Sequence, residues 1–363
     1  MWILIYLTIF IISFLLSFFL TFLFKKISIW CNILDLPSSR KIHQKPTPLL
    51  GGLGIFFSFL LTILLGFISL KTNFIFQIIK EHLPGIISCE RKLLSIVIGG
   101  VLVVSFGIFD DIFSFRARIK LIFQILISII VFSSGIRISL FVPNIFFSIL
   151  VTVFWIVLMM NSFNLLDNMD GLSAGVSFIC GGILFISAFY MNQLFVSTLI
   201  VVFLGSVAGF LKHNFPPAKV FMGECGSSFL GYFLGIISIL LTFYRYGEGK
   251  SFLPVFTPLI VFSVPFFDTI SVFWIRKKRK LSIFQADKNH LSHRLVNLGM
   301  SNKQAVLLIY FLTICTGMGT LFLNSLNIFG GILVIVQVVI ILSIVGILEL
   351  SGRKKNDTNN SGT

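Results

Sequence analysis

The chain has few charged residues: Asp, Glu, Lys and Arg together make up only 11% of its 363 positions. Hydrophobic residues make up 56%, and the mean hydropathy is +1.03. Soluble globular domains carry about 25% charged residues, so this composition excludes one. It predicts a protein that crosses a membrane several times.

Acidic residues are especially scarce, with 13 Asp and Glu against 28 Lys and Arg and a formal net charge of +15. An excess of positive charge can indicate nucleic-acid binding. Here, however, the cations lie between apolar segments, where the positive-inside rule explains them. Nucleic acid is therefore not an expected partner.

The five cysteines are scattered without a C-x-x-C pair, so the sequence indicates neither a zinc site nor a disulfide framework. A cleavable signal peptide is not expected either. Residues 1–24 are apolar but have no basic start and no small-residue cleavage site, so they are expected to remain as the first helix. The sequence shows no internal repeat of the kind that transporters carry.

The apolar runs predict an all-α fold, a polytopic bundle of about eleven transmembrane helices, because eleven runs can cross a core of roughly 30 Å. One domain, 1–350, is expected, followed by a disordered cytoplasmic tail, 351–363. The expected spans are 2–24, 48–70, 93–109, 119–135, 144–161, 172–190, 194–212, 226–243, 253–275, 304–324 and 328–349.

The distribution of Lys and Arg predicts that the amino terminus lies outside and the carboxyl terminus in the cytoplasm. With this orientation, 21 of the 28 Lys and Arg fall in inner segments. These segments are 25–47, 110–120, 212–225, 276–303 and 350–363. All the polar-rich motifs then lie on the cytoplasmic face.

One polar stretch separates two apolar runs and contains three amides and two carboxylates. Asn161, Asn164 and Asn168 share one face if the preceding helix continues, and Asp167 and Asp170 can project nearby. Polar groups at a membrane boundary are costly without partners, so the cluster indicates a functional site. The alternative is a polar helix cap followed by a glycine turn.

Further carboxylates flank this stretch in the sequence. Asp110 and Asp111 end a predicted span, with Lys120 nearby, and adjacent carboxylates are typical ligands of a hard divalent ion such as Mg²⁺. The alternative is an ion-paired boundary loop. Glu224 follows Gly223 at the start of another span, where free backbone amides favour phosphate; an ordinary turn and cap would look the same.

Near the carboxyl end, His290, His293 and Arg294 lie on one face if their segment is helical. They could bind a diphosphate or shuttle a proton, or they could be solvated surface residues. Asp268 lies within an apolar run, so it either faces substrate or is the buried partner of an arginine.

This set of carboxylates, cations, amides and glycines is typical of phosphoryl transfer between a soluble donor and a lipid acceptor. One alternative is a secondary transporter or lipid-linked-sugar flippase, whose ionisable groups would lie near the midplane. Another is a non-catalytic scaffold, against which the retained carboxylates argue.

In order and spacing, the motifs resemble those of the polyprenyl-phosphate N-acetylhexosamine-1-phosphate transferases, over about Asp35 to Leu295. The matching motifs are Arg40-Lys-x-His43-x-x-Pro-Thr47-Pro-x-x-Gly51-Gly52, Asp110-Asp111 with Lys120 and Gln124, Asn161-x-x-Asn164-x-x-Asp167-x-x-Asp170-Gly-Leu, Gly223-x-x-Gly-Ser, Pro265-x-Phe-Asp268 and His290-x-x-His293-Arg-Leu.

The resemblance implies an enzyme of the bacterial inner membrane, with its active site facing the cytoplasm and Mg²⁺, or alternatively Mn²⁺, as cofactor. It would transfer GlcNAc-1-phosphate or a related sugar phosphate from a UDP-N-acetylhexosamine to undecaprenyl phosphate, releasing UMP. The form of the last motif is closer to the branch that starts O-antigen, common-antigen and teichoic-acid linkage glycans. A homodimer is left open.

The resemblance also implies residue roles. Asp110, Asp111 and Asp167 would be catalytic, and the same three with Glu224 would bind the metal. The substrate-binding set would be Lys45, Thr47, Lys120, Asn161, Asn164, Asp170, His290, His293 and Arg294. Glu224, Asn168 and Ser292 stand where the family usually has Asp, Gly and His, which concerns donor specificity more than reaction class.

Overall fold

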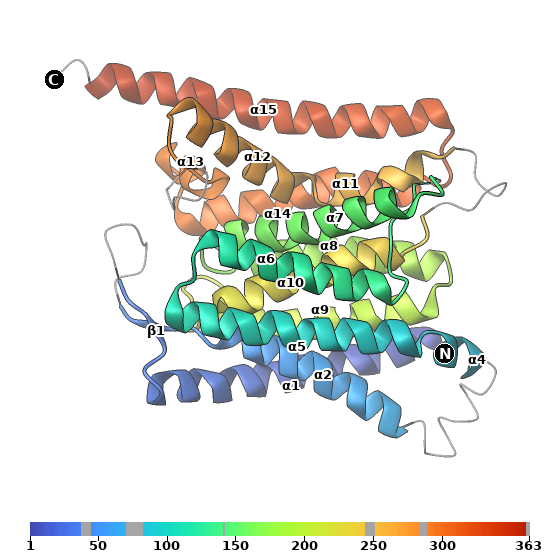
Figure 1. Ribbon diagram of the computed structural model, residues 1–363. Helices are drawn as coiled ribbons and strands as arrows, with labels where there is room; N and C mark the ends of the chain where they lie inside the picture. Colours follow the sequence, from blue (N-terminus) through green and yellow to red (C-terminus); the bar gives the residue numbers. More distant parts are fainter. Residues whose placement is uncertain (38–44, 70–82, 141, 244–250, 283–288, 361–363) are drawn as a thin grey trace. The chain divides into compact units, whose positions relative to one another are not determined.

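The structure, a computed structural model, is built almost entirely from helices. It describes residues 1–37, 45–69, 83–140, 142–243, 251–282 and 289–360 (Figure 1). The chain divides into two compact units, Met1–Leu241 and Thr242–Thr363, which are described separately below as unit 1 and unit 2.

Unit 1 contains the larger set of helices and two very short strands. In chain order these are α1 (Trp2–Trp30), β1 (Leu34–Asp35), β2 (Thr47–Pro48), α2 (Gly51–Ser69), α4 (Leu83–Ser88), α5 (Glu90–Phe113), α6 (Ala117–Ser133), α7 (Ile145–Leu166), α8 (Leu172–Tyr190), α9 (Leu194–Asn214) and α10 (Gly223–Leu240).

Unit 2 contains shorter helices followed by one long terminal helix. They are η2 (Leu253–Phe256), α11 (Thr257–Val261), α12 (Ser263–Lys278), α13 (Leu291–Asn297), α14 (Asn302–Met318), η3 (Gly319–Phe322) and α15 (Ile328–Asn360). Helix α15 includes residues 351–360, the first part of the tail that was expected to be disordered. Residues 361–363 lie outside the described part of the chain.

The predicted polytopic, all-α class is confirmed. Among the described residues, nine helices are long and apolar enough to cross a membrane, and the segment Leu253–Val261 (η2 and α11) with the bent continuation α12 would make a tenth span. Helix α6, which coincides with the expected span at 119–135, has 17 residues. The count of eleven and the orientation of the chain stay predictions.

The bend between α11 and α12 has a local cause in the sequence. The two helices meet at an angle of 63°. Pro265 has no N–H to donate to the carbonyl of Val261, the last residue of α11, so an unbroken helix would lose a hydrogen bond there.

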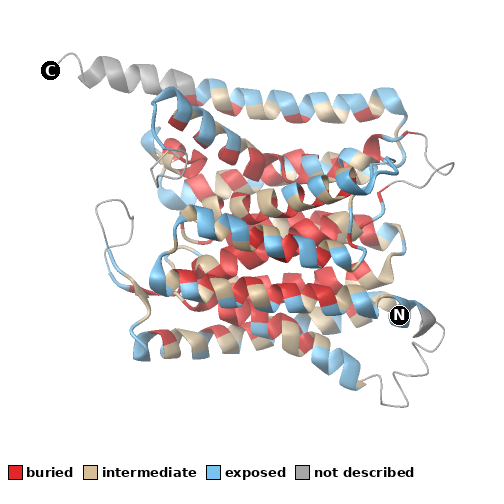
Figure 2. Ribbon diagram, viewed as in Figure 1, coloured by how far each residue is buried: buried red, intermediate tan, exposed pale blue. Residues whose placement is uncertain are grey.

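Helix α10 is the centre of unit 1. Of the 18 residues of α10, 83% are buried, against 17% in an apolar stretch of the same length in α1, and Figure 2 shows this contrast. Two glycines allow close packing. A Cβ at Gly107 of α5 would overlap the backbone of Cys225, and one at Gly231 would overlap the carbonyl of Met159 on α7.

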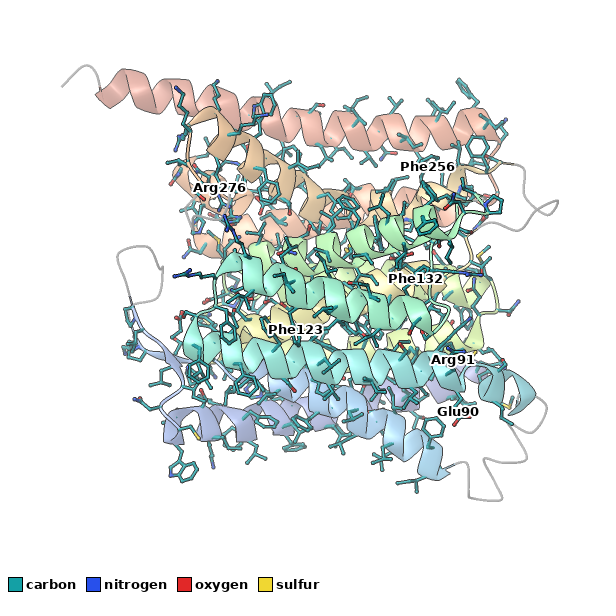
Figure 3. All side chains as sticks on the ribbon, viewed as in Figure 1. Glu90, Arg91, Phe123, Phe132, Phe256 and Arg276 are labelled. Carbon is teal, nitrogen blue, oxygen red and sulfur yellow. The ribbon has the colours of Figure 1, made fainter. Side chains whose placement is uncertain are left out.

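Aromatic stacking joins α5 to α6 beside this centre. The rings of Phe106 and Phe123 are nearly parallel, with centroids 4.1 Å apart, and Phe123 is labelled in Figure 3. This contact supports the short turn between the two helices. Figure 1 shows that turn at the same end of unit 1 as β1.

A small antiparallel strand pair was not predicted, because two-residue strands leave no alternation pattern to detect. Leu34 pairs with Pro48, and Asp35 pairs with Thr47. The last residue of β2 then bonds to the loop before α10. The N–H of Phe221 donates to the Pro48 carbonyl at 2.8 Å, so the starts of α2 and α10 are held side by side.

We expect Gly107→Ala to destabilise the protein, because the new methyl group would press on the α10 backbone. Overpacking of this kind costs about 1–3 kcal/mol. The measurement is the thermal unfolding midpoint in detergent. Gly182→Ala is the control, since a Cβ there would meet no described atom within 4 Å. Equal midpoints for the two variants would show that the α5–α10 packing is looser than described.

Candidate functional site

The Lys120 ammonium group lies between two carboxylates at one end of unit 1. Its Nζ atom is 2.5 Å from Asp110 Oδ2 and 2.8 Å from Glu224 Oε1. The chain reverses between α5 and α6 at Ser114, whose φ is +52°, and the Phe115 N–H donates to Asp110 Oδ1 at 2.8 Å. Asp110 thus both closes the turn and holds Lys120.

Asp111 points toward the start of α10. Its Oδ1 atom accepts the N–H of Glu224 at 2.9 Å, whereas its Oδ2 atom is buried and has no hydrogen-bond partner among the described residues. Gly223 is needed for this approach, because its φ is +69° and a Cβ would lie 2.5 Å from Asp111 Oδ2.

Helix α7 contributes two of the three predicted amides to this region. The Asn164 Nδ2 donates to Glu224 Oε2 at 2.5 Å, and the Asn161 Nδ2 donates to Gln124 Oε1 at 2.7 Å. The predicted common face is therefore confirmed for these two. Helix α7 ends at Leu166, so the helical face does not extend to Asn168, which donates to the Leu165 carbonyl instead.

The two remaining aspartates lie in the turn after α7. Asp170 Oδ2 accepts the N–H of Ala218 at 2.8 Å, which ties the turn to the loop before α10. Burial, followed by the negative charges of Glu224, Asp111 and Asp170, raises the pKa of Asp167 to about 8. The carboxylates around Asp167 therefore outnumber the single positive charge that Lys120 contributes to this region.

Asn214 is a structural residue of this turn that the sequence reasoning missed. It is buried at the end of α9, where its Oδ1 accepts the N–H of Gly171 at 3.0 Å and its Nδ2 donates to the Val220 carbonyl at 2.8 Å. One feature of the sequence could have indicated this role: Asn214 is a single amide at the end of an apolar run, just before Pro216 and Pro217.

The first motif is only partly described. Thr47 is buried in β2 and its hydroxyl donates to the Lys45 carbonyl at 3.1 Å. Lys45 itself is exposed. Arg40 and His43 of the same motif lie outside the described residues.

The donor set of unit 1 fits a hard divalent cation. Among the described residues, no group of three His, Cys, Asp or Glu forms a ready-made metal cage. Mg²⁺ does not require one, because it is usually held by one or two carboxylates together with substrate phosphates. The partnerless Oδ2 of Asp111 and the crowded carboxylate of Asp167 are oxygens of the required kind.

In unit 2, the last motif forms a buried charged network. Asp268 Oδ2 lies 3.0 Å from His290 Nδ1, and Arg294 Nε donates to Glu349 Oε2 at 2.9 Å. Asp268 Oδ1 also lies 4.0 Å from Arg294 Nη1, so Asp268 is the buried partner of an arginine, one of the two predicted alternatives. His293 is partly exposed, and Glu349 of α15 is a member that the sequence reasoning did not identify.

The apolar helices and the acidic cluster of unit 1 define a polytopic membrane protein with a polar site at the ends of four of its helices. Known proteins identify its family. The profile of glycosyl transferase family 4 matches residues 93–242. A probable undecaprenyl-phosphate N-acetylglucosaminyl 1-phosphate transferase of Bacillus subtilis is 31% identical over 336 residues, covering 90% of this chain and 87% of that protein.

Two further relatives agree. A decaprenyl-phosphate N-acetylglucosaminephosphotransferase of Mycolicibacterium smegmatis is 30% identical, covering 76% of this chain and 71% of that protein. An undecaprenyl-phosphate alpha-N-acetylglucosaminyl 1-phosphate transferase of Escherichia coli K12 is 25% identical, covering 78% and 75%. The chain belongs to glycosyl transferase family 4, among the polyprenyl-phosphate N-acetylhexosamine-1-phosphate transferases.

We expect the stability of the metal-free protein to fall as the pH rises from 6 to 8. An aspartate in the unfolded chain has a pKa of about 3.9. Because folding raises the pKa of Asp167, the folded state favours its protonated form, and that advantage is lost as the pH rises toward 8.

The measurement is the unfolding midpoint in detergent with EDTA, across this pH range. Asp167→Asn should flatten the decline, whereas Glu90→Gln, which changes an exposed carboxylate, should keep it. An unchanged slope in Asp167→Asn would contradict the assignment.

Proposed function

We propose that this protein transfers N-acetylglucosamine 1-phosphate from a UDP-linked sugar to a polyprenyl phosphate and releases UMP. The observation that carries the proposal is the carboxylate cluster of Asp111, Asp167 and Glu224, in which Glu224 also binds Lys120. It occurs in a chain whose relatives are named for transfer of N-acetylglucosamine 1-phosphate to undecaprenyl or decaprenyl phosphate.

The reaction needs alignment and charge neutralisation more than covalent chemistry. An oxygen of the polyprenyl phosphate attacks the phosphorus that carries the sugar, and the bond from that phosphorus to the UMP oxygen breaks. The acceptor is a phosphate monoester, which is already a nucleophile near neutral pH. The protein must therefore bring two anionic substrates together.

The residues of unit 1 are suited to that task. Asp111, Asp167 and Glu224 would hold Mg²⁺, or Mn²⁺, which when bound supplies positive charge to the phosphates. Asp110 keeps Lys120 in place, and Asn164 keeps the Glu224 carboxylate in place. The turn that carries Asp170 would hold the nucleotide.

In unit 2, His290 and His293 would bind the donor diphosphate. We further propose that the enzyme faces the cytoplasm from the bacterial inner membrane, with its amino terminus outside. Its product would then start a cell-envelope glycan, with undecaprenyl phosphate as the acceptor.

The direct experiment uses purified protein, undecaprenyl phosphate and UDP-GlcNAc labelled in the sugar, with Mg²⁺ or with EDTA. We expect label to enter the organic phase only with Mg²⁺, together with UMP and not UDP. Release of UDP would mean transfer of the sugar alone. No lipid labelling with any UDP-N-acetylhexosamine would overturn the proposal.

We expect Asp111→Asn to lower the transfer rate about a hundredfold to a thousandfold, a magnitude typical of losing one key charge-stabilising group. The amide can still accept the N–H of Glu224, so the fold should survive. Initial rates are compared with those of Glu90→Gln, which should match the unsubstituted protein. A fully active Asp111→Asn variant would exclude Asp111 as a metal ligand.

A further inference from the structure

Each of the three nitrogens of the Arg294 guanidinium group donates a hydrogen bond inside unit 2. Its Nε donates to Glu349 Oε2 at 2.9 Å, its Nη2 donates to Ser271 Oγ at 2.8 Å, and its Nη1 donates to the Asn289 carbonyl. The residue is only 4% exposed. All three nitrogens are thus bonded to acceptors on three different segments of the chain.

This arrangement leaves little capacity for phosphate. Arginine usually binds phosphate bidentately, through two parallel N–H groups on one edge of the guanidinium. In Arg294 the Nε and Nη2 edge is occupied by Glu349 and Ser271. A donor diphosphate would have to displace a buried carboxylate to reach it, and breaking a buried ion pair is costly.

Asp268 holds the start of the motif, His290 and Leu291, through two buried contacts. Its Oδ1 accepts the Leu291 N–H at 2.5 Å, and its Oδ2 lies 3.0 Å from His290 Nδ1. Asp268 is 1% exposed. Because Nδ1 is occupied by the carboxylate, Nε2 is the ring nitrogen of His290 left for a ligand. The His293 ring lies 6.4 Å from that of His290, and His293 is partly exposed.

We propose that Asp268, Arg294 and Glu349 are positioning residues that fix His290 and His293, and that Arg294 does not itself bind the donor. The inference rests on the proposed function, since it assumes that the two histidines bind the donor diphosphate. Buried ion pairs add little stability over apolar residues of similar size, which favours a role in orientation. The terminal helix α15 thereby becomes part of the support of the site through Glu349.

The test compares Glu349→Gln, Arg294→Gln and the double variant with the unsubstituted protein. For each, the KM for UDP-GlcNAc, the KM for undecaprenyl phosphate and kcat are measured, and UDP binding is measured separately by calorimetry. Glu90→Gln is the matched acid-to-amide control. Loss of properly folded protein would lower kcat and leave both KM values unchanged, so the donor KM isolates positioning.

We expect each single variant to raise the donor KM and weaken UDP binding about tenfold, a shift typical of residues in one hydrogen-bonded network. The acceptor KM should stay within about twofold, and the double variant should be no worse than either single one. If Arg294→Gln does not fold, Ser271→Ala removes one acceptor and should shift the donor KM in the same direction by a smaller factor.

Two results would overturn this inference alone. One is an unchanged donor KM in Glu349→Gln. The other is a double variant whose defect equals the product of the two single defects, which would mean that Arg294 contacts the donor independently of Glu349. An unsubstituted protein that neither transfers sugar phosphate nor binds UDP would overturn the proposed function, and the inference with it.

Discussion

Charged groups in an apolar bundle need partners, and in unit 1 the partly buried ammonium of Lys120 is shared between Asp110 and Glu224. This sharing draws the end of α5, the start of α6 and the start of α10 to one point. Asn164 adds the end of α7 through its bond to Glu224. The ends of four helices that are otherwise apolar are therefore brought together by one set of polar contacts.

The same contacts leave the cluster incompletely neutralised. One buried oxygen of Asp111 has no partner among the described residues, and the pKa of Asp167 is raised by burial and then by its acidic neighbours. A stable fold alone gives no reason to gather so many carboxylates. A site that receives a divalent cation and phosphates does, because the cation would supply the missing positive charge.

The sequence predicted those features that depend on local pattern. Hydropathy located the helices, and the i, i+3 spacing placed Asn161 and Asn164 on one face. The sequence could not show that Glu349 belongs to the network, because its partner Arg294 is 55 positions away. Nor could it show that the Arg294 guanidinium is already bonded to other residues of the protein. The role of Asn214 was missed for the same reason, because it depends on contacts with two separate loops, at Gly171 and at Val220. Such contacts are fixed by packing and leave no periodic signal.

The most direct test of the central claim is binding of Mn²⁺, a spectroscopic substitute for Mg²⁺, followed by electron paramagnetic resonance of the purified protein with UDP-GlcNAc. The account predicts one bound ion per chain, lost in Asp111→Asn and retained in Glu90→Gln. Equal binding by the unsubstituted protein and Asp111→Asn, or no binding by either, would contradict a metal-assisted site at these carboxylates.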